Sequence, residues 1–144
     1  MLAISTSAEE TRKLAGEFMR ELSNGPVTSR TIIELVGDLG AGKTTFMQGV
    51  GEFFGIKESV VSPTFVIQKN YEIPAGFAWD RLIHIDAYRI EDEAELRAIA
   101  FEGYASDPRN IIFIEWPSNM KTDLGAVRRV EFAHKSENER EIKI

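Results

Sequence analysis

The chain has 144 residues, a net charge of −6 and no cysteine. Its length is that of one domain, so we expect residues 1–144 to form a single domain around one hydrophobic core. The lack of cysteine excludes disulfides, thiolate catalysis and cysteine-ligated zinc. An acidic chain also lacks the broad basic face that nucleic-acid backbones require, so direct binding to a nucleic acid is not expected.

The first ten residues contain neither a basic start nor a long apolar run, so they do not resemble a signal peptide. No stretch approaches the roughly 20 apolar residues that span a bilayer. We therefore expect a soluble cytoplasmic protein without membrane attachment.

The first predicted element is a helix. Ser7 and Glu10 have the spacing of a capping box, and apolar residues recur every four positions up to Leu22, before Asn24-Gly25-Pro26 ends the helix. Residues 31–36 are β-branched or apolar and predict a buried strand. After a glycine-rich turn at 37–43, a second helix is expected from Thr44 to about residue 54, with a glycine cap at 55.

Strands and helices continue to alternate through the rest of the chain. The sequence predicts strands at 60–71, 82–86 and 111–115, a helix at 91–100, and a C-terminal hairpin of 127–133 and 140–144. The loop around Ala75 is too short for a crossover helix, so the two strands that flank it cannot be parallel neighbours. The expected architecture is an α/β three-layer P-loop NTPase fold with a mostly parallel, mixed central sheet.

The turn Gly37-Asp-Leu-Gly-Ala-Gly-Lys-Thr44 fits the pattern G-x-x-x-x-G-K-[ST], between a predicted strand and a predicted helix. Glycines let successive backbone N–H groups face one point, and the helix adds its positive end. The lysine at position 43 reaches the β- and γ-phosphates, and the hydroxyl of Thr44 ligates Mg²⁺. ATP or ADP with Mg²⁺ is therefore the expected ligand, held by Asp38, Gly40, Ala41, Gly42, Lys43, Thr44 and Thr45.

Two carboxylates end hydrophobic strands, where open α/β sheets collect their ligands. Asp86 closes Leu82–Asp86, and Glu115 closes Ile111–Glu115. One could hold Mg²⁺, directly or through water, and the other could orient the attacking water. The predicted catalytic residues are therefore Lys43, Asp86 and Glu115.

Four further features leave alternatives open. Trp116 could lie against a nucleotide, although core filling is the commoner role of a buried tryptophan. His84, within an apolar strand, fits a satisfied structural histidine. The turn Ser62-Pro-Thr-Phe65 could sense the γ-phosphate or only start a strand. Arg89 could contact phosphate, contact a partner, or pair with a nearby acidic residue.

Taken together, four blocks resemble the TsaE family, also called YjeE, whose members are small bacterial ATPases of tRNA threonylcarbamoyladenosine synthesis. The blocks are Gly37–Phe46, Ser62–Phe65, His84–Arg89 and Ile114–Pro117. The P-loop alone is shared with many proteins, whereas the ordered set of four in a short chain is specific. One departure is Ala100, where many relatives have glycine after the acidic helix.

The resemblance implies a function that spacing does not show. Family members hydrolyse ATP slowly and act with the TsaB–TsaD pair, which transfers a threonylcarbamoyl group to the adenosine beside the anticodon of tRNA. Contact with tRNA would then be indirect, through that complex. The resemblance makes Glu115 the metal-site carboxylate and Asp86 the Walker-B-like carboxylate. It also brings Trp116 near the nucleotide and places Thr11 on the adenine side.

Two other classes of function compete with this interpretation. A small-molecule P-loop kinase would need a substrate pocket and usually an arginine-bearing lid, and the chain has no arginine-rich insertion. A nucleotide-gated binding module would not need two carboxylates at strand ends. An accessory ATPase accounts for both the lack of an arginine-rich insertion and the presence of two carboxylates at strand ends.

Overall fold

A computed structural model describes residues 1–27, 29–61, 63 and 67–144 of the chain. The helices are α1 (Ala8–Ser23), α2 (Lys43–Phe54), α3 (Glu93–Ala98) and α4 (Phe101–Ala105), with a 3₁₀ turn η1 (Pro117–Met120). The strands are β1 (Leu2–Ser5), β2 (Thr31–Val36), β3 (Gln68–Glu72), β4 (Arg81–Asp86), β5 (Asn110–Glu115), β6 (Arg128–His134) and β7 (Arg140–Lys143).

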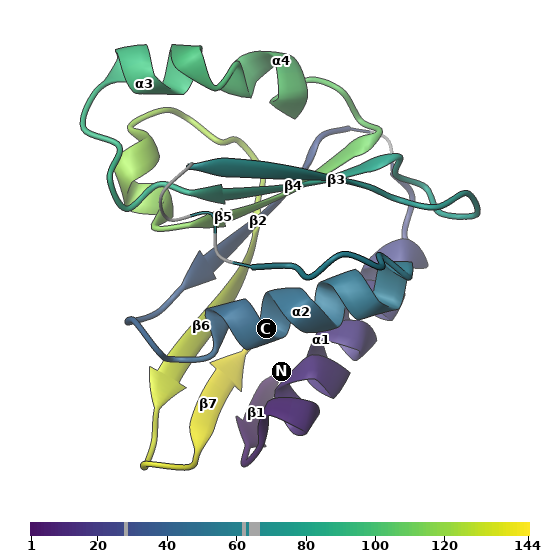
Figure 1. Cartoon of the computed structure of the whole chain (residues 1–144), viewed down its shortest axis with the longest axis vertical. Coiled ribbons are helices and arrows are strands. Elements are labelled where there is room, and N and C mark those ends of the chain that lie inside the picture. The colour runs from purple at the N-terminus through teal and green to yellow at the C-terminus, as the bar shows by residue number, and fades with distance from the viewer. Residues whose placement is uncertain (28, 62, 64–66) are drawn as a thin grey trace.

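The strands form one mixed sheet in the order β1-β7-β6-β2-β5-β4-β3 (Figure 1). The four central strands, β6, β2, β5 and β4, pair in parallel. The outer strands pair antiparallel with their neighbours, β1 with β7, β7 with β6, and β3 with β4. The predicted mixed α/β sheet is confirmed, and so are the C-terminal hairpin and the antiparallel pairing across the loop at residue 75.

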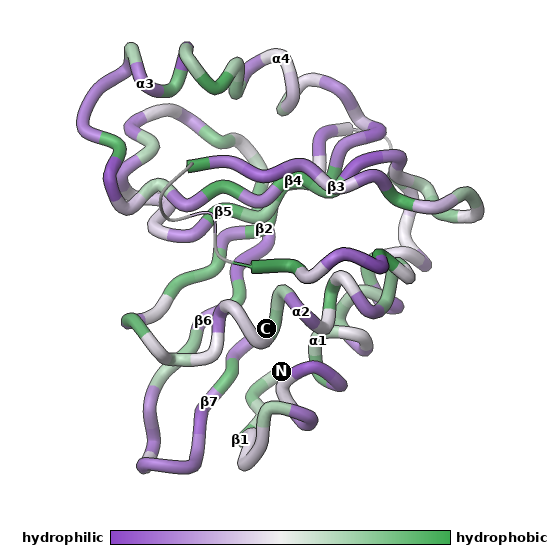
Figure 2. Tube along the Cα trace, viewed as in Figure 1, coloured by the Kyte–Doolittle hydropathy of each residue, from purple (hydrophilic) through white to green (hydrophobic). Residues whose placement is uncertain are grey.

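Helices cover both faces of this sheet, which gives the three predicted layers. Figure 1 shows α1 and α2 together on one side, and α3 and α4 on the other. Alternation along β2 sends Ile33 and Leu35 toward α1 and α2 and Ile32 toward α3 and α4, since successive strand residues point to opposite faces. Hydrophobic residues concentrate in the central strands, whereas the turn between β6 and β7 is hydrophilic (Figure 2).

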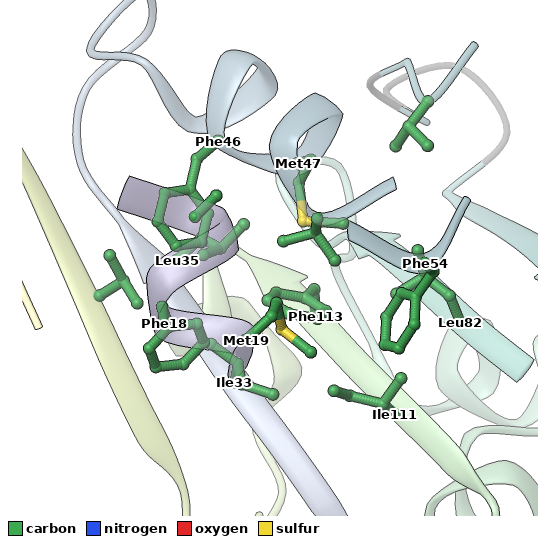
Figure 3. Packing of buried hydrophobic residues seen from close by; sticks show 14 of the residues in the cluster. Phe18, Met19, Ile33, Leu35, Phe46, Met47, Phe54, Leu82, Ile111 and Phe113 are labelled. Atoms are coloured by element: carbon green, nitrogen blue, oxygen red, sulfur yellow. The ribbon is translucent and has the colours of Figure 1, made fainter. Parts of the chain in front are cut away.

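The core under α1 and α2 is the larger of the two. Phe18 and Met19 of α1 meet Phe46 and Met47 of α2 above Phe113 of β5 (Figure 3). The two helices approach closely at a glycine of α2, where an added Cβ would lie 2.5 Å from the carbonyl oxygen of Arg12. This packing holds the start of α2, and with it the glycine-rich turn, against the sheet.

The predicted strand at 60–71 is confirmed only at its end, where β3 begins at Gln68. Among its earlier described residues, 60, 61, 63 and 67 are not in a strand, and Val60 packs as a core residue beside Gly51 of α2. Pro63 lacks the N–H that a strand would donate, which disfavours a ladder at that position. Ser62, Thr64 and Phe65 lie outside the described residues, so the proposed γ-phosphate role of that turn stays a prediction.

The predicted helix at 91–100 is shorter than expected and is followed by a second helix. The side chain of Asp92 caps α3, accepting from the backbone N–H of Glu95 at 3.1 Å. Ala100 then adopts a left-handed conformation with φ of 55°, which ends the first helix and redirects the chain into α4. The sequence also did not predict β1, a four-residue strand that is recognisable only through its pairing with β7.

Within the residue ranges given above, no helix has the length and apolar character needed to cross a membrane.

Replacing Ala100 with glycine should stabilise the protein by about 1 kcal/mol. A non-glycine residue in the left-handed region costs roughly 1–2 kcal/mol. Removing this cost outweighs the extra conformational entropy that glycine gives to the unfolded chain. Thermal unfolding should show a melting temperature about 3–4 °C higher for a domain of this size. The matched control is Ala94→Gly, at an exposed position within α3, which should lower stability. An unchanged or lower melting temperature for Ala100→Gly would contradict the prediction.

Candidate functional site

Three parallel strands deliver the predicted site residues to one edge of the sheet. Strand β2 ends at Val36 and leads into the glycine-rich turn, while β4 and β5 end at Asp86 and Glu115. These two carboxylates are direct register partners, and Leu35 of β2 is the register partner of Glu115 on its other side. The structure therefore brings the turn and both carboxylates together.

The backbone of the turn requires glycine at two points. At Gly37 an added Cβ would lie 2.6 Å from the carbonyl oxygen of Phe132, so only glycine allows the turn to leave β2 this close to β6. Gly42 has φ of 111°, a conformation that other residues rarely adopt. As the N-cap of α2, Gly42 has no side chain with which to cap the helix. The first turn of α2 also contains no acidic residue, which suits the binding of an anion there.

Lys43 is buried at the start of α2 and faces inward. Its Nζ donates to the carbonyl oxygens of Gly37 and, at 2.9 Å, of Asp38. Nζ also lies 5.2 Å from the centroid of the Trp116 ring. Burial lowers the pKa of Lys43, and the nearby carboxylates of Glu115, Asp86 and Asp38 act in the opposite direction.

Asp86 and Glu115 are both buried, and each is anchored by a neighbouring group. Oδ1 of Asp86 accepts a hydrogen bond from the backbone N–H of Tyr88 at 3.0 Å. Oε2 of Glu115 lies 3.0 Å from Nε2 of His84, which is fully buried. The expectation of a satisfied structural histidine is therefore only half right. One ring nitrogen contacts the predicted site, and Nδ1 finds no hydrogen-bond partner among the described residues.

Two adjoining pockets surround the turn. The larger has a volume of about 480 Å³ and is lined by Leu39, Gly40, Gly42, Lys43, Thr44, Thr45, Asp86, Tyr88, Arg89 and Glu115. The smaller has a volume of about 250 Å³ and is lined by Ser5, Thr6, Ser7, Ala8, Thr11, Gly40, Gly42, Thr45, Glu137, Asn138 and Arg140. Residues of the turn line both pockets, so an elongated ligand could extend from the two carboxylates to Thr11.

Three of the predicted binding residues, Asp38, Ala41 and Trp116, are not among the residues that line these two pockets. The side chain of Ala41 is buried in the core, and its backbone N–H donates to the carbonyl oxygen of Asp38 at 3.1 Å. Asp38 is exposed and lines a separate cavity of about 800 Å³. Its main-chain carbonyl, which receives Nζ of Lys43, is the part that reaches the site.

Trp116 follows Glu115 in a left-handed conformation, with φ of 56° and ψ of 52°. This turn ends β5 and brings the ring beside Tyr88, a lining residue of the larger pocket, with 5.1 Å between the two ring centroids. We call this contact the rim of the site. Trp116 itself lines the separate cavity of about 800 Å³ together with Asp38. The indole is half-buried and also packs against the core under α3 and α4. The core packing that the sequence left open is thus seen in part, and contact of Trp116 with a nucleotide stays a prediction. The other tryptophan, Trp79, is fully in the core.

Sequence reasoning missed some residues that line the site. Tyr88 and the exposed Leu39 line the larger pocket, and Arg140 lines the smaller one together with Thr11. The signal for Tyr88 was its position two residues after Asp86, just past a strand end. No local pattern marked Arg140, because its neighbours across the pocket lie at the other end of the chain.

The donor groups in the larger pocket suit Mg²⁺. The hydroxyl of Thr44 and the carboxylates of Asp86 and Glu115 line the same space, and Mg²⁺ prefers oxygen ligands. Among the described residues no group of three or more His, Asp or Glu side chains could hold a metal by itself. Mg²⁺ commonly binds through one or two carboxylates together with substrate phosphates, so these residues fit that mode.

Comparison with known proteins points to one family. The family model described as "Threonylcarbamoyl adenosine biosynthesis protein TsaE" matches residues 5–142. A protein of Aquifex aeolicus named "tRNA threonylcarbamoyladenosine biosynthesis protein TsaE" is 34% identical over 143 residues, covering 98% of this chain and 92% of its own. A protein of the same name from Nostoc sp. is 41% identical over 100 residues, covering 65% of this chain but 57% of its own.

The chain thus spans little more than half the length of that Nostoc relative. Among solved structures, the crystal structure of YdiB from Bacillus subtilis superposes with a TM-score of 0.66 at 29% identity. The match covers 99% of this chain and 82% of that one. The whole P-loop NTPase architecture, with its mixed sheet, is therefore shared with YdiB.

We predict that Lys43→Ala weakens binding of ATP and ADP at least tenfold. The variant loses a buried ammonium group at the phosphate position, and charge-assisted hydrogen bonds of this kind contribute about 1.5–3 kcal/mol. Titration of a fluorescent ATP analogue measures the affinity, and thermal unfolding checks that the variant is folded. Lys13→Ala, at an exposed position on α1, is the matched control. Equal affinity of wild type and Lys43→Ala would contradict the prediction.

We also predict that Trp116 fluorescence reports nucleotide binding. Its ring lies beside Lys43 and Tyr88 at the rim, so a nucleotide that draws Lys43 toward phosphate changes the surroundings of the indole. Emission should shift or quench on addition of ADP. Trp116→Phe should remove most of the change, and Trp79→Phe should keep it. The opposite pattern would mean that the nucleotide binds away from this rim.

Proposed function

The chain belongs to the TsaE family, and from this premise we propose that it hydrolyses ATP as the accessory ATPase of tRNA threonylcarbamoyladenosine synthesis. The observation that carries the proposal is the meeting of Lys43, Asp86 and Glu115 in one pocket beside an uncapped helix start. A positive group and helix amides suit phosphates, and two carboxylates suit a metal and a water molecule.

In this proposal the turn and Lys43 bind the β- and γ-phosphates. Without a ligand, Nζ of Lys43 is held by the carbonyl oxygens of Gly37 and Asp38. Phosphate oxygens would replace these neutral acceptors with charged ones, which form stronger hydrogen bonds. The backbone amides at the start of α2 would add further donors, and Thr45, which lines both pockets, lies where the phosphate chain would turn toward the base.

The two carboxylates would divide the catalytic work. We assign Glu115 to the metal and Asp86 to the Walker-B position, as the family resemblance implies. Mg²⁺ bound with Thr44 and the carboxylates would neutralise charge on the phosphates during transfer. A carboxylate that is buried next to the bound metal can also orient the attacking water molecule by accepting a hydrogen bond from it.

The base and ribose would occupy the smaller pocket. Thr11 and Arg140 both line this pocket of about 250 Å³, together with Gly42 of the turn and Thr45 of α2. Thr11 is held in place by its Oγ1, which lies 2.8 Å from Oγ of Ser5 in β1. The N-terminal strand and helix therefore would shape the adenine side.

The partner in this proposal is a TsaB–TsaD-type complex, with tRNA reached only through it. The net charge of −6 supports this indirect role, since an isolated acidic domain binds a nucleic-acid backbone poorly. Pull-down with a TsaB–TsaD pair, with and without ATP, tests the partner. No retention under either condition would contradict it.

A small-molecule kinase is the alternative that shares this P-loop. Release of inorganic phosphate from ATP without any added acceptor separates the two, because a kinase transfers phosphate to its substrate. Absence of acceptor-free phosphate release, both alone and with the TsaB–TsaD pair, would overturn the proposed ATPase activity.

We predict that Asp86→Asn and Glu115→Gln each lower the hydrolysis rate about 100-fold while changing the affinity for metal-free ADP less than about threefold. The amides keep the shape of the carboxylates but lose the charge that holds the metal or activates the water. Phosphate release and nucleotide affinity are measured separately, with Glu17→Gln on the exposed side of α1 as control. Wild-type hydrolysis by both variants would show that the two-carboxylate assignment is wrong.

A further inference from the structure

His84 is an unusual residue for its position in the fold. It lies in the middle of β4, is fully buried, and has Phe113 of β5 as its register partner. Its side chain shares a face of the sheet with Leu82 and Asp86, because strand residues two apart point the same way. Leu82 and Phe113 belong to the core under α1 and α2, so an apolar side chain at position 84 would continue that core.

Among the residues that the structure describes, the histidine makes a single polar contact, which is with the predicted catalytic carboxylate. Nε2 of His84 lies 3.0 Å from Oε2 of Glu115. A carboxylate only accepts hydrogen bonds, so Nε2 carries the proton and donates it to this bond. Nδ1 then lies buried without a hydrogen-bond partner among the described residues.

This arrangement is costly for folding, because a buried polar atom without a partner loses its hydration and gains nothing. Packing of the core therefore does not explain a histidine at this position, whereas a hydrogen bond that orients the carboxylate of Glu115 does. A hydrogen bond to Oε2 fixes the rotation of the carboxylate about its last bond and thereby aims Oε1.

We propose that His84 is a positioning residue that holds the carboxylate of Glu115 in the orientation required to act on Mg²⁺-nucleotide. The inference rests on the proposed function, since it takes the role of Glu115 from there. Groups behind a metal-site ligand commonly set its orientation, and their loss costs about 10–100-fold in metal affinity or activity.

Two amide variants separate positioning from mere burial of a polar group. In His84→Gln the amide nitrogen lies about as far along the side chain as Nε2, so a donor to Glu115 is retained. In His84→Asn the amide nitrogen lies near the place of Nδ1 and falls short of Glu115. Both variants are neutral, polar and buried, and thermal unfolding of each checks that the fold is kept.

The primary measurement is the Mg²⁺ dependence of ADP affinity, taken as the ratio of dissociation constants without and with Mg²⁺. The second is the rate of phosphate release from ATP. His84→Asn should lower about tenfold either the factor by which Mg²⁺ strengthens ADP binding or the rate of phosphate release from ATP. The affinity for metal-free ADP should stay unchanged. His84→Gln should stay within about threefold of wild type, because its donor still reaches Glu115.

A double-mutant comparison then tests whether His84 acts through Glu115. In a Glu115→Gln background, His84→Asn should cause no further loss, because the group that it positions is already disabled. Additive losses would overturn the proposal, as would equal impairment of His84→Gln and His84→Asn. Wild-type values of both measurements for His84→Asn would overturn it as well.

The two measurements also keep this inference apart from the ATPase proposal. If the wild type releases no phosphate but Mg²⁺ strengthens ADP binding, the ATPase proposal fails and the Mg²⁺ comparison of the three proteins still decides the role of His84. If Mg²⁺ has no effect on ADP binding and no phosphate is released, both proposals fail.

Discussion

The parallel pairing of β2, β5 and β4 is the constraint on which the site depends. Because parallel strands end at the same edge, residues 29 positions apart, Asp86 and Glu115, become register partners beside the turn that follows β2. A slip of one residue in this register would turn both carboxylates toward the opposite face, under α3 and α4. The alternating apolar residues of β2, β4 and β5 prevent that slip, since each face has its own core. Core packing thus sets the positions of the two carboxylates relative to the turn that follows β2.

Charge balance at this edge is the second theme. One buried lysine and two buried carboxylates lie within a small volume, and leaving any of them without compensation would be expensive. Main-chain carbonyls of Gly37 and Asp38 hold Lys43, and His84 holds one oxygen of Glu115. A nucleotide with Mg²⁺ would bring both signs of charge into this arrangement, so the chain's own hydrogen bonds occupy places that ligand groups would take.

Local signals account for most of the fold. Strands 31–36, 82–86 and 111–115 are apolar runs whose burial on both faces requires no information from elsewhere, and they were predicted within a residue or so. The failures have different origins. Val60 packs into the core beside α2 rather than in a strand, and Ala100 takes a left-handed conformation that its residue type disfavours. Strand β1 exists through its ladder with β7, which lies at the other end of the chain.

The sequence by itself determined the glycine-rich turn and the carboxylates at two strand ends, because the glycine pattern and the strand boundaries are local properties of the chain. The order of four short sequence blocks also indicated the family. Only the tertiary structure decided that His84 contacts Glu115, that Trp116 turns to the rim beside Tyr88, and that Thr11 and Arg140 share a pocket. These contacts join residues from different elements, and their distances follow from sheet order and strand register. No local periodicity encodes that order, since it results from the packing of the whole chain.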